Sequence, residues 1–378
     1  MAENKQNKRP NVPPLRFPEF TEPWEPSTLQ EIAEFSKGTG ISKEQRSETG
    51  LPCILYGELY TTYSNEVIED VVSRTDLDPT DLVKSQSNDV IIPSSGETAE
   101  DIATARCVTD DNVLLGGDIN IIRLNEPHDG RFMSYQLNGI RKYDIAKIAQ
   151  GVSVVHLYSN ELKKMSVSLP QSAEQKKIAN FLGLLDRRIV IQSKLIEQLE
   201  SLIKGIIHRL TAQSPNVRIA DCLDCYSSSL QENLLNELGK CRVYGANGVC
   251  GYTDSHAINS DAILIVKDGS GVGNVSFATG EYSVIGTLNY LTSKSGYNLR
   301  YIYYCLMNFN FMPYKTGMAI PHIYFKDYGK AKIYCPALEE QDRIANILSK
   351  IERKIAIERS ISDHHIKQKQ YLLQRLFI

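Results

Sequence analysis

The sequence predicts an α+β protein in which two globular domains are separated by two long antiparallel helices. These helices form a coiled-coil-like spacer, and the whole chain has internal pseudo-two-fold symmetry. The main observation is that residues 151–210 match residues 317–376 without a gap, with about sixteen identities in about sixty positions. In addition, each copy ends in a long amphipathic stretch, and short apolar runs cut by glycine precede each copy. A chain with two similar faces usually binds something that has two similar places.

The elements follow in order along the 378 residues, a length that suits two domains with separate cores. Residues 1–14 are polar and proline-rich, so we expect a disordered lead-in. Residues 15–169 form the first globular domain and residues 215–335 the second, because both contain short β-runs punctuated by glycine. The two domains correspond loosely, since Tyr56-Gly57 resembles Tyr244-Gly245. The globular parts have diverged more than the helices.

The helices span residues 170–214 and 336–378. In the first helix, Ser172-x-x-Gln175 is a capping box, and a heptad stripe runs for about four and a half heptads behind it, which predicts a helix of about 60 Å. The second helix begins and ends alike but has a polar middle. We expect antiparallel pairing with Gln192 opposite Ser362, and the alternative is two independent amphipathic helices on their own domains. The polar positions are Glu358, Ser362, His365 and Lys369.

Net charge limits the function. The total is −3, but residues 1–150 hold 15 Lys and Arg against 25 Asp and Glu. Attraction to phosphates supplies most of the base affinity of DNA-binding proteins, so this chain needs a basic partner if it binds DNA. No signal peptide, long apolar run or lipid motif is visible, which predicts a cytoplasmic protein that does not engage a membrane. The eight scattered cysteines fit reduced thiols.

These residues resemble the DNA-specificity (S) subunit of type I restriction–modification systems over nearly the full length. The motifs that carry the resemblance are Leu15-Arg-Phe-Pro-Glu-Phe20 with Trp24-Glu25, Pro170…Glu174-Gln175-x-x-Ile178-Ala179, Pro336…Glu340-Gln341-x-x-Ile344-Ala345, Tyr244-Gly-x-Asn247-Gly248, and Asp261-Ala-Ile-Leu-Ile-Val-Lys-Asp-Gly269.

The resemblance implies a division of labour. Each globular domain is a target-recognition domain that reads one half of a split, asymmetric double-stranded DNA target, and the helices act as a ruler between the halves. Two methyltransferase (modification) subunits dock on the helical region, and motor-nuclease (restriction) subunits join for cleavage. Adenine methylation and restriction therefore belong to partner subunits, which hold S-adenosylmethionine, and ATP with Mg; no cofactor is expected in this chain.

Three motifs have competing interpretations. Gly269-Ser-Gly271-Val-Gly273 follows an apolar strand as a nucleotide-binding loop does, but a further strand-like run follows in place of a helix, which favours a turn. Cys222-x-x-Cys225 with Cys241 and Cys250 has the residues of a zinc site at irregular spacing, which favours ordinary thiols and no metal. His156 and His322 are equivalent in the repeat, and each is either a DNA-facing or a structural histidine.

No catalytic residues are predicted, since no Asn/Asp-Pro-Pro-aromatic run, nuclease cluster or helicase phosphate loop is present. The predicted function is sequence recognition by polar side chains on glycine-flanked loops. The alternatives are a helical protein–protein scaffold with peptide-binding domains, or an enzyme that uses the Gly269 loop. The predicted DNA-binding residues are Lys37, Tyr56, Ser94, Ser95, Thr98, Tyr244, Asn247, Lys267, Ser270, Lys315 and His322. The predicted partner-binding residues are Glu174, Gln175, Ile178, Glu340, Gln341 and Ile344.

Overall fold

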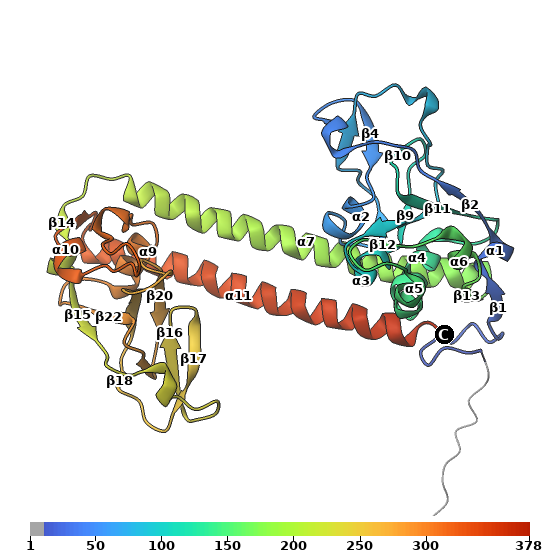
Figure 1. Ribbon diagram of the computed structural model, residues 1–378. Helices are drawn as coiled ribbons and strands as arrows, with labels where there is room; N and C mark the ends of the chain where they lie inside the picture. The colour runs from blue at the N-terminus through green and yellow to red at the C-terminus, as the bar shows by residue number, and fades with distance from the viewer. Residues whose placement is uncertain (1–10) are drawn as a thin grey trace, which may run out of the picture. The chain divides into compact units, whose positions relative to one another are not determined.

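The computed structural model describes residues 11–378, which form two compact units (Figure 1). The first unit contains the chain up to Ser193 together with Ser360–Ile378, and the second contains Lys194–Arg359. Helix α7 (Ser172–Thr211) and helix α11 (Leu338–Arg375) each contribute one half to each unit. The units thus cut through both long helices, whereas the sequence-based division treats each helix as a separate segment.

The first unit contains a five-stranded sheet of order β2-β11-β7-β9-β5 and a four-stranded sheet of order β10-β4-β6-β3. Strand β7 is buried along its whole length, because it lies in the middle of the larger sheet and carries the apolar run Val-Ile-Ile-Pro. The strands are β1 (Glu25–Thr28), β2 (Ala33–Lys37), β3 (Arg46–Ser47), β4 (Leu51–Ile54), β5 (Val67–Ile68), β6 (Ser73–Thr75), β7 (Val90–Pro93), β8 (Ser95–Gly96), β9 (Arg106–Val108), β10 (Leu114–Leu115), β11 (Ile119–Leu124), β12 (Val155–His156) and β13 (Ser166–Leu169).

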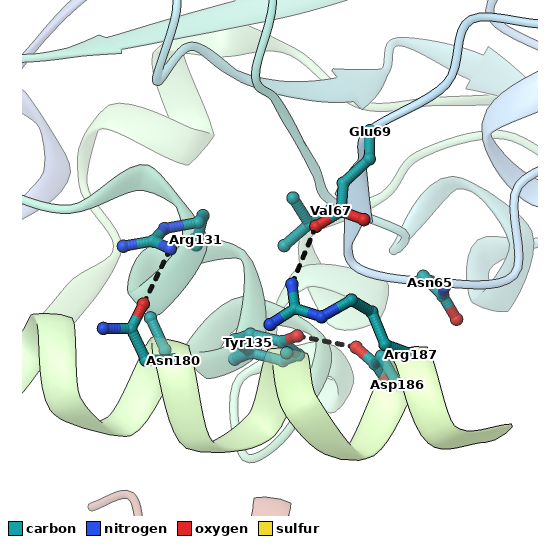
Figure 2. A pocket seen from close by; sticks show the side chains of 10 residues that line it. Asn65, Val67, Glu69, Arg131, Tyr135, Asn180, Asp186 and Arg187 are labelled. Atoms are coloured by element: carbon teal, nitrogen blue, oxygen red, sulfur yellow. Dashed lines mark hydrogen bonds and ion pairs between the residues drawn. The ribbon is translucent and has the colours of Figure 1, made fainter. Parts of the chain in front are cut away.

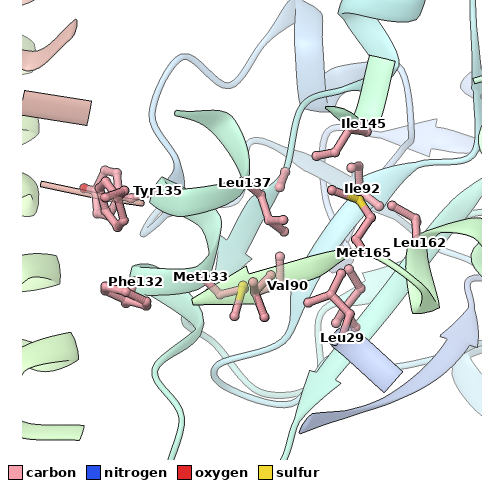
Figure 3. Packing of buried hydrophobic residues seen from close by; sticks show 14 of the residues in the cluster. Leu29, Val90, Ile92, Phe132, Met133, Tyr135, Leu137, Ile145, Leu162 and Met165 are labelled. Atoms are coloured by element: carbon pink, nitrogen blue, oxygen red, sulfur yellow. The ribbon is translucent and has the colours of Figure 1, made fainter. Parts of the chain in front are cut away.

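Short helices cover these sheets. The helices of this unit are α1 (Leu29–Ile32), α2 (Glu58–Thr61), α3 (Ala99–Ile102), α4 (Gly130–Asn138), α5 (Lys142–Ile148) and α6 (Ser159–Lys163), with 3-10 turns η1 (Lys43–Gln45) and η2 (Pro79–Asp81). Figure 3 shows how Phe132 and Met133 of α4 pack with Val90 and Ile92 of the central strand in one apolar core. This core is what holds the sheet against the helices.

The end of the chain completes this core. Phe377 packs against Trp24 and Phe132, with ring centroids 6.3 Å and 5.3 Å apart. The Leu15 N–H donates to the Arg375 carbonyl at 2.9 Å. A disordered lead-in was expected over residues 1–14. Residues 1–10 of that segment lie outside the described residues. From Asn11 onward the segment is placed, since the Asn11 carbonyl accepts a 2.9 Å hydrogen bond from the Trp24 N–H.

The second unit repeats the plan with two four-stranded sheets, of order β15-β22-β19-β20 and β17-β16-β21-β18. The central strand β19 is fully buried, as β7 is in the first unit. Apart from the long helices, the elements of the second unit are β14 (Val217–Arg218), α8 (Ile219–Cys222), β15 (Leu223–Ser227), η3 (Glu232–Leu234), β16 (Cys241–Gly245), β17 (Gly248–Thr253), β18 (Ile258–Asn259), β19 (Ala262–Val266), β20 (Val275–Ala278), β21 (Glu281–Val284), β22 (Leu288–Ser293), α9 (Leu299–Met307), η4 (Met312–Tyr314), α10 (Phe325–Tyr328) and β23 (Lys332–Ile333).

The two long helices run antiparallel within each unit. In the first unit, the start of α7, with Ile178 and Leu182, shares a core with Leu372 near the end of α11. In the second unit, Ile203 near the end of α7 shares a core with Leu348 near the start of α11. The predicted antiparallel pairing is therefore confirmed, and the alternative of two independent helices is wrong.

The polar middle of α11 also has an explanation. Lys354 pairs with the buried Glu358 one turn later. Lys369 reaches Glu66 and Asp186, both buried, and lies 2.6 Å from the Asp186 carboxylate. Ser362 is buried, as the expected layer opposite Gln192 requires, although that particular pairing stays a prediction. Among residues 11–378, none of the helices combines the length and the apolar character needed to cross a membrane.

Candidate nucleic-acid interface

The same glutamine joins helix and globular region in both units. The Gln175 side chain donates to the Pro170 carbonyl at 2.8 Å and accepts from the Asp129 N–H at 3.0 Å. Gln341 does the same in the second unit, with the Pro336 carbonyl at 2.8 Å and the Asn298 N–H at 3.0 Å. Since Asp129 and Asn298 cap α4 and α9, each glutamine ties its long helix to the start of a buried helix.

A second pair of equivalent contacts lies about three turns further along each long helix. The Tyr135 hydroxyl of α4 donates to Asp186 at 2.6 Å, and the Tyr304 hydroxyl of α9 donates to Glu352 at 2.7 Å. Burial raises the pKa of both tyrosines, with the nearby acid adding to the effect at Tyr135, so both stay protonated donors at neutral pH. The repeated residues thus attach two different globular regions to the two similar long helices.

Most of the predicted partner-binding residues serve this internal attachment. Glu174 is buried and forms a 2.7 Å ion pair with Arg16. Gln175, Gln341, Ile178 and Ile344 are also buried. Buried side chains cannot form a docking surface in this conformation, which corrects the expected assignment for these five residues. Only Glu340 of that set is partly accessible, and it pairs with Arg343 at 2.6 Å.

We expect Gln175→Ala and Gln341→Ala each to lower the free energy of unfolding by about 1–3 kcal/mol, because each leaves a buried N–H and a carbonyl without partners. Hydrogen–deuterium exchange followed by mass spectrometry should show the loss in the first unit for Gln175→Ala and in the second for Gln341→Ala. The exposed Gln171→Ala is the matched control. Equal protection from exchange in all three variants would show that the Gln175 and Gln341 side chains do not contribute to the free energy of unfolding.

Of the predicted DNA-binding residues in the first unit, Lys37 and Tyr56 are exposed. Lys37 ends β2, where its backbone pairs with Asn120 of β11. Ser94 and Ser95 are buried, and the Ser94 carbonyl accepts from the Leu157 N–H at 2.9 Å. Their side chains therefore cannot reach bases in this conformation, which corrects that expectation. Thr98 is exposed and caps α3 by accepting from the Asp101 N–H at 3.1 Å.

In the second unit the structure gathers several predicted residues in one loop cluster. His322 Nδ1 lies 2.7 Å from Asp268 Oδ1, and the Lys267 carbonyl accepts from the Ile323 N–H at 2.9 Å. Ser270 is exposed in the same glycine loop, which leads directly into strand β20. A strand therefore follows the glycine loop, as expected, so the loop has no helix N-terminus to offer a phosphate.

Asn247 lies at the tip of the β16–β17 hairpin and lines an open groove of about 550 Å³. Asn274 and Ser276 line the same groove from the glycine loop and β20. The sequence reasoning missed Asn274, although its place directly after the glycine run could have indicated it. Tyr244 is half-buried and packs edge-on against Tyr282, with ring centroids 5.5 Å apart. Lys315 is exposed and precedes the loop that ends at His322.

The first unit also contains a small cavity of about 60 Å³ between α7 and the globular region (Figure 2). Arg131 bonds Asn180 at 2.9 Å on one side of it, and Arg187 pairs with Glu69 at 3.1 Å on the other. This volume suits a few water molecules rather than a ligand. We therefore assign it to the attachment of the helix and not to recognition.

For the cysteines, the sequence allows either a zinc site at irregular spacing or ordinary thiols, and it favours ordinary thiols. Cys222 Sγ lies 4.0 Å from Cys335 Sγ in the buried core. Within residues 11–378, no group of three or more His, Cys, Asp or Glu side chains is arranged to hold a metal ion. The cysteines are free thiols, and burial raises the pKa of Cys225 to about 11.

Two different α+β regions are thus attached to the two copies of the repeated helix by equivalent glutamine and tyrosine contacts. The chain belongs to the family of the type I restriction modification DNA specificity domain, whose model matches residues 21–201 and 216–364. This confirms the family resemblance drawn from the motifs.

Several known proteins are similar to the chain. A putative type I restriction enzyme specificity subunit of Haemophilus influenzae is 26% identical over 113 residues, which span 29% of each chain. The EcoprrI specificity subunit of Escherichia coli is 26% identical over 109 residues, or 29% of this chain and 27% of that one. These alignments thus span under a third of those relatives.

Two solved structures share the fold. The type I restriction–modification S subunit from M. genitalium has a TM-score of 0.72 at 19% identity, covering 97% of this chain and 99% of that one. A chain from a structure of type I restriction–modification complex assembly and conformational transition has a TM-score of 0.53 at 18% identity, covering 96% and 99%. Together they confirm the predicted fold class.

Proposed function

We propose that this chain is a non-catalytic DNA-recognition subunit that reads a bipartite, asymmetric target and directs adenine methylation and restriction by partner subunits. The observation that carries this proposal is that the contacts between the long helices and the globular regions are the same in both units, whereas the neighbouring loops are different. The glutamine and tyrosine contacts are the same in both units. The side chains beside them differ: the same antiparallel backbone pairing places Asp268 opposite His322, with His322 Nδ1 2.7 Å from Asp268 Oδ1, but places Ser95 opposite His156. Two different sets of loops, each attached in the same way to a copy of the repeated helix, suit two different half-sites.

The outer face of the helices supports docking of two copies of one methyltransferase subunit. Phe181, Arg188 and Ile191 of α7 are exposed at heptad spacing. The equivalent positions in α11 are the exposed Ile347, Lys354 and Ile357. A surface that combines two apolar side chains with a cation, present twice, suits two identical partners. This set replaces the buried residues that the sequence reasoning assigned to docking.

The charge distribution supports the need for partners. Residues 1–150 hold ten more acidic than basic side chains, so the first globular region repels the DNA backbone at long range. We infer that methyltransferase subunits help to hold the duplex and that motor-nuclease subunits join for cleavage. S-adenosylmethionine, and ATP with Mg, would be bound by those partners and not by this chain.

The recognition loops provide a direct test. In a complex with the methyltransferase subunits, Asn247→Ala should relax base preference in one half of the methylated sequence, costing about 1–3 kcal/mol for a lost bidentate contact. Lys37→Ala should affect only the other half. Sequencing of methylated adenines across a genome that carries each variant measures both effects.

The control for this test is Lys330→Ala, an exposed lysine outside the loop cluster, which should leave the methylated sequence unchanged. Relaxation of both halves by either loop variant would refute independent reading by the two units. Absence of DNA binding by the wild-type complex over random duplexes would instead favour the scaffold with peptide-binding domains.

A further inference from the structure

Each unit carries a short loop of the same geometry, here called a tip loop. The first comprises residues 151–155 and the second residues 317–321. The first is closed by reciprocal backbone hydrogen bonds between Gln150 and His156 at 2.9 and 2.7 Å. The second is closed by the same bonds between Thr316 and His322 at 2.9 and 2.7 Å. Both loops are therefore held firmly at their base.

Glycine is required at the start of both tip loops. Gly151 has φ +128° and Gly317 has φ +85°, which are backbone conformations that other residues rarely adopt. A Cβ atom at Gly151 would lie 2.1 Å from the Val154 carbonyl oxygen, and one at Gly317 would lie 2.2 Å from the Ile320 carbonyl oxygen. The loops thus share a tight turn that only this residue permits, which explains why both glycines recur in the repeat.

The tips of both loops are apolar and open to solvent. Val152 is 94% exposed and Val154 is 53% exposed. The equivalent Met318 and Ile320 are 105% and 59% exposed. Exposed apolar side chains that recur at equivalent places on two loops of the same closure indicate a contact that this chain alone does not provide.

Each tip loop lies beside the segment that follows the central strand of its unit. In the first unit, β12 at the end of the tip loop pairs with β8, which follows the central strand β7. In the second unit, the Gly269 N–H of the glycine loop donates to the Pro321 carbonyl at 3.0 Å. A histidine and a tyrosine follow each tip at the same spacing, with ring centroids 6.1 Å apart for His156 and Tyr158 and 6.4 Å for His322 and Tyr324.

We propose that each tip loop inserts its apolar side chains between two stacked base pairs, one step in each half of the DNA target. This inference rests on the proposed function. The two tip loops are alike whereas the neighbouring recognition loops differ, which fits a ligand that is the same in both halves and independent of base sequence. Base-pair stacks meet that condition, and valine, isoleucine and methionine suit the faces of bases rather than phosphates. Unstacking near the target also lowers the cost of turning an adenine out of the helix for methylation.

The test uses the assembled complex of this chain with its methyltransferase subunits, bound to the duplex identified by methylation sequencing. 2-Aminopurine is placed at successive positions, because its fluorescence rises when stacking is lost. The wild-type complex should give one bright step in each half. The double variant Met318→Ser/Ile320→Ser should lose the signal only in the second unit's half and bind the duplex about tenfold more weakly. Val152→Ser/Val154→Ser should do the same in the other half.

Leu238→Ser and Val72→Ser are matched controls, since both remove an exposed apolar side chain away from the tip loops. These variants should keep both signals. Assembly with the methyltransferase subunits, measured by sedimentation, should be unchanged in all variants. Unaltered fluorescence and affinity in the tip variants would overturn the proposal, and so would loss of assembly, which would identify the tips as protein contacts. A wild-type complex that binds no DNA would refute the proposed function itself.

Discussion

Replacing Lys369 with alanine is expected to lower the free energy of unfolding of the first unit by about 3–5 kcal/mol. The Lys369 ammonium lies 2.6 Å from Asp186 and also pairs with Glu66, and both carboxylates are buried. Without the ammonium, no lysine would neutralise the two buried acids, although Asp186 would keep its hydrogen bond from Tyr135. Burial lowers the pKa of Lys369, but the charges of Glu66 and Asp186 outweigh burial and raise it overall, so the side chain is charged at neutral pH.

Denaturant unfolding and hydrogen exchange of first-unit peptides would measure the loss. The exposed Lys367→Ala on the same helix is the matched control and should have little effect. Lys369→Met combined with Glu66→Gln and Asp186→Asn should recover part of the stability, because no buried carboxylate is left without a cation, although the buried Arg106 then loses two nearby acids. Because the folded pKa is raised, the contribution of Lys369 is fully present below the unfolded lysine pKa of about 10.4 and declines only as the pH rises through the folded value. An alanine variant as stable as the control would contradict this account.

Lengthening both long helices by one heptad is expected to widen the gap between the two half-sites by about three base pairs. Seven residues inserted after Gln192 in α7, and seven before Ser362 in α11, add about 10 Å to each helix and keep the heptad phase. Each base pair rises about 3.4 Å, which gives the expected change. Sequencing of methylated adenines should show both half-sites unchanged and only the spacer lengthened.

Two further insertions make this test specific. Seven residues inserted after the exposed Leu238, which lies outside the helices, should leave the spacer as it was. Seven residues in α7 alone should disturb the shared cores, because α11 would no longer match it. An unchanged spacer in the doubly lengthened protein would show that the helices do not set the distance.

The sequence predicted the architecture well because the repeat and the heptad stripe are local signals. The structure places α7 at Ser172–Thr211, within the expected 170–214, and α11 at Leu338–Arg375, within 336–378. The paired helical cores follow from the same stripe. Periodic burial is readable from residues close in sequence, so these elements needed no knowledge of tertiary contacts.

The site residues were harder because repetition does not reveal what a residue contacts. Gln175 and Gln341 recur because each binds equivalent backbone groups inside its own unit. A repeated residue that contacts an external partner would leave the same pattern in the sequence. Ser94 and Ser95 lie in a glycine-flanked stretch that looks like a loop but is buried beside the central strand. Lys369 was an unexplained polar residue, because its partner Glu66 lies 303 positions away in sequence.

The position of Phe377 has a consequence for the order in which the protein forms during synthesis. The second unit is one continuous stretch, Lys194–Arg359, and all of its core residues are made before the last helical turns. The first unit needs Phe377 to pack beside Trp24 and Phe132, although those two residues are translated early. The domain that begins the chain is therefore the last to form completely, because its apolar core is finished only after the final residues leave the ribosome. A premature stop near the end should damage the first domain and spare the second.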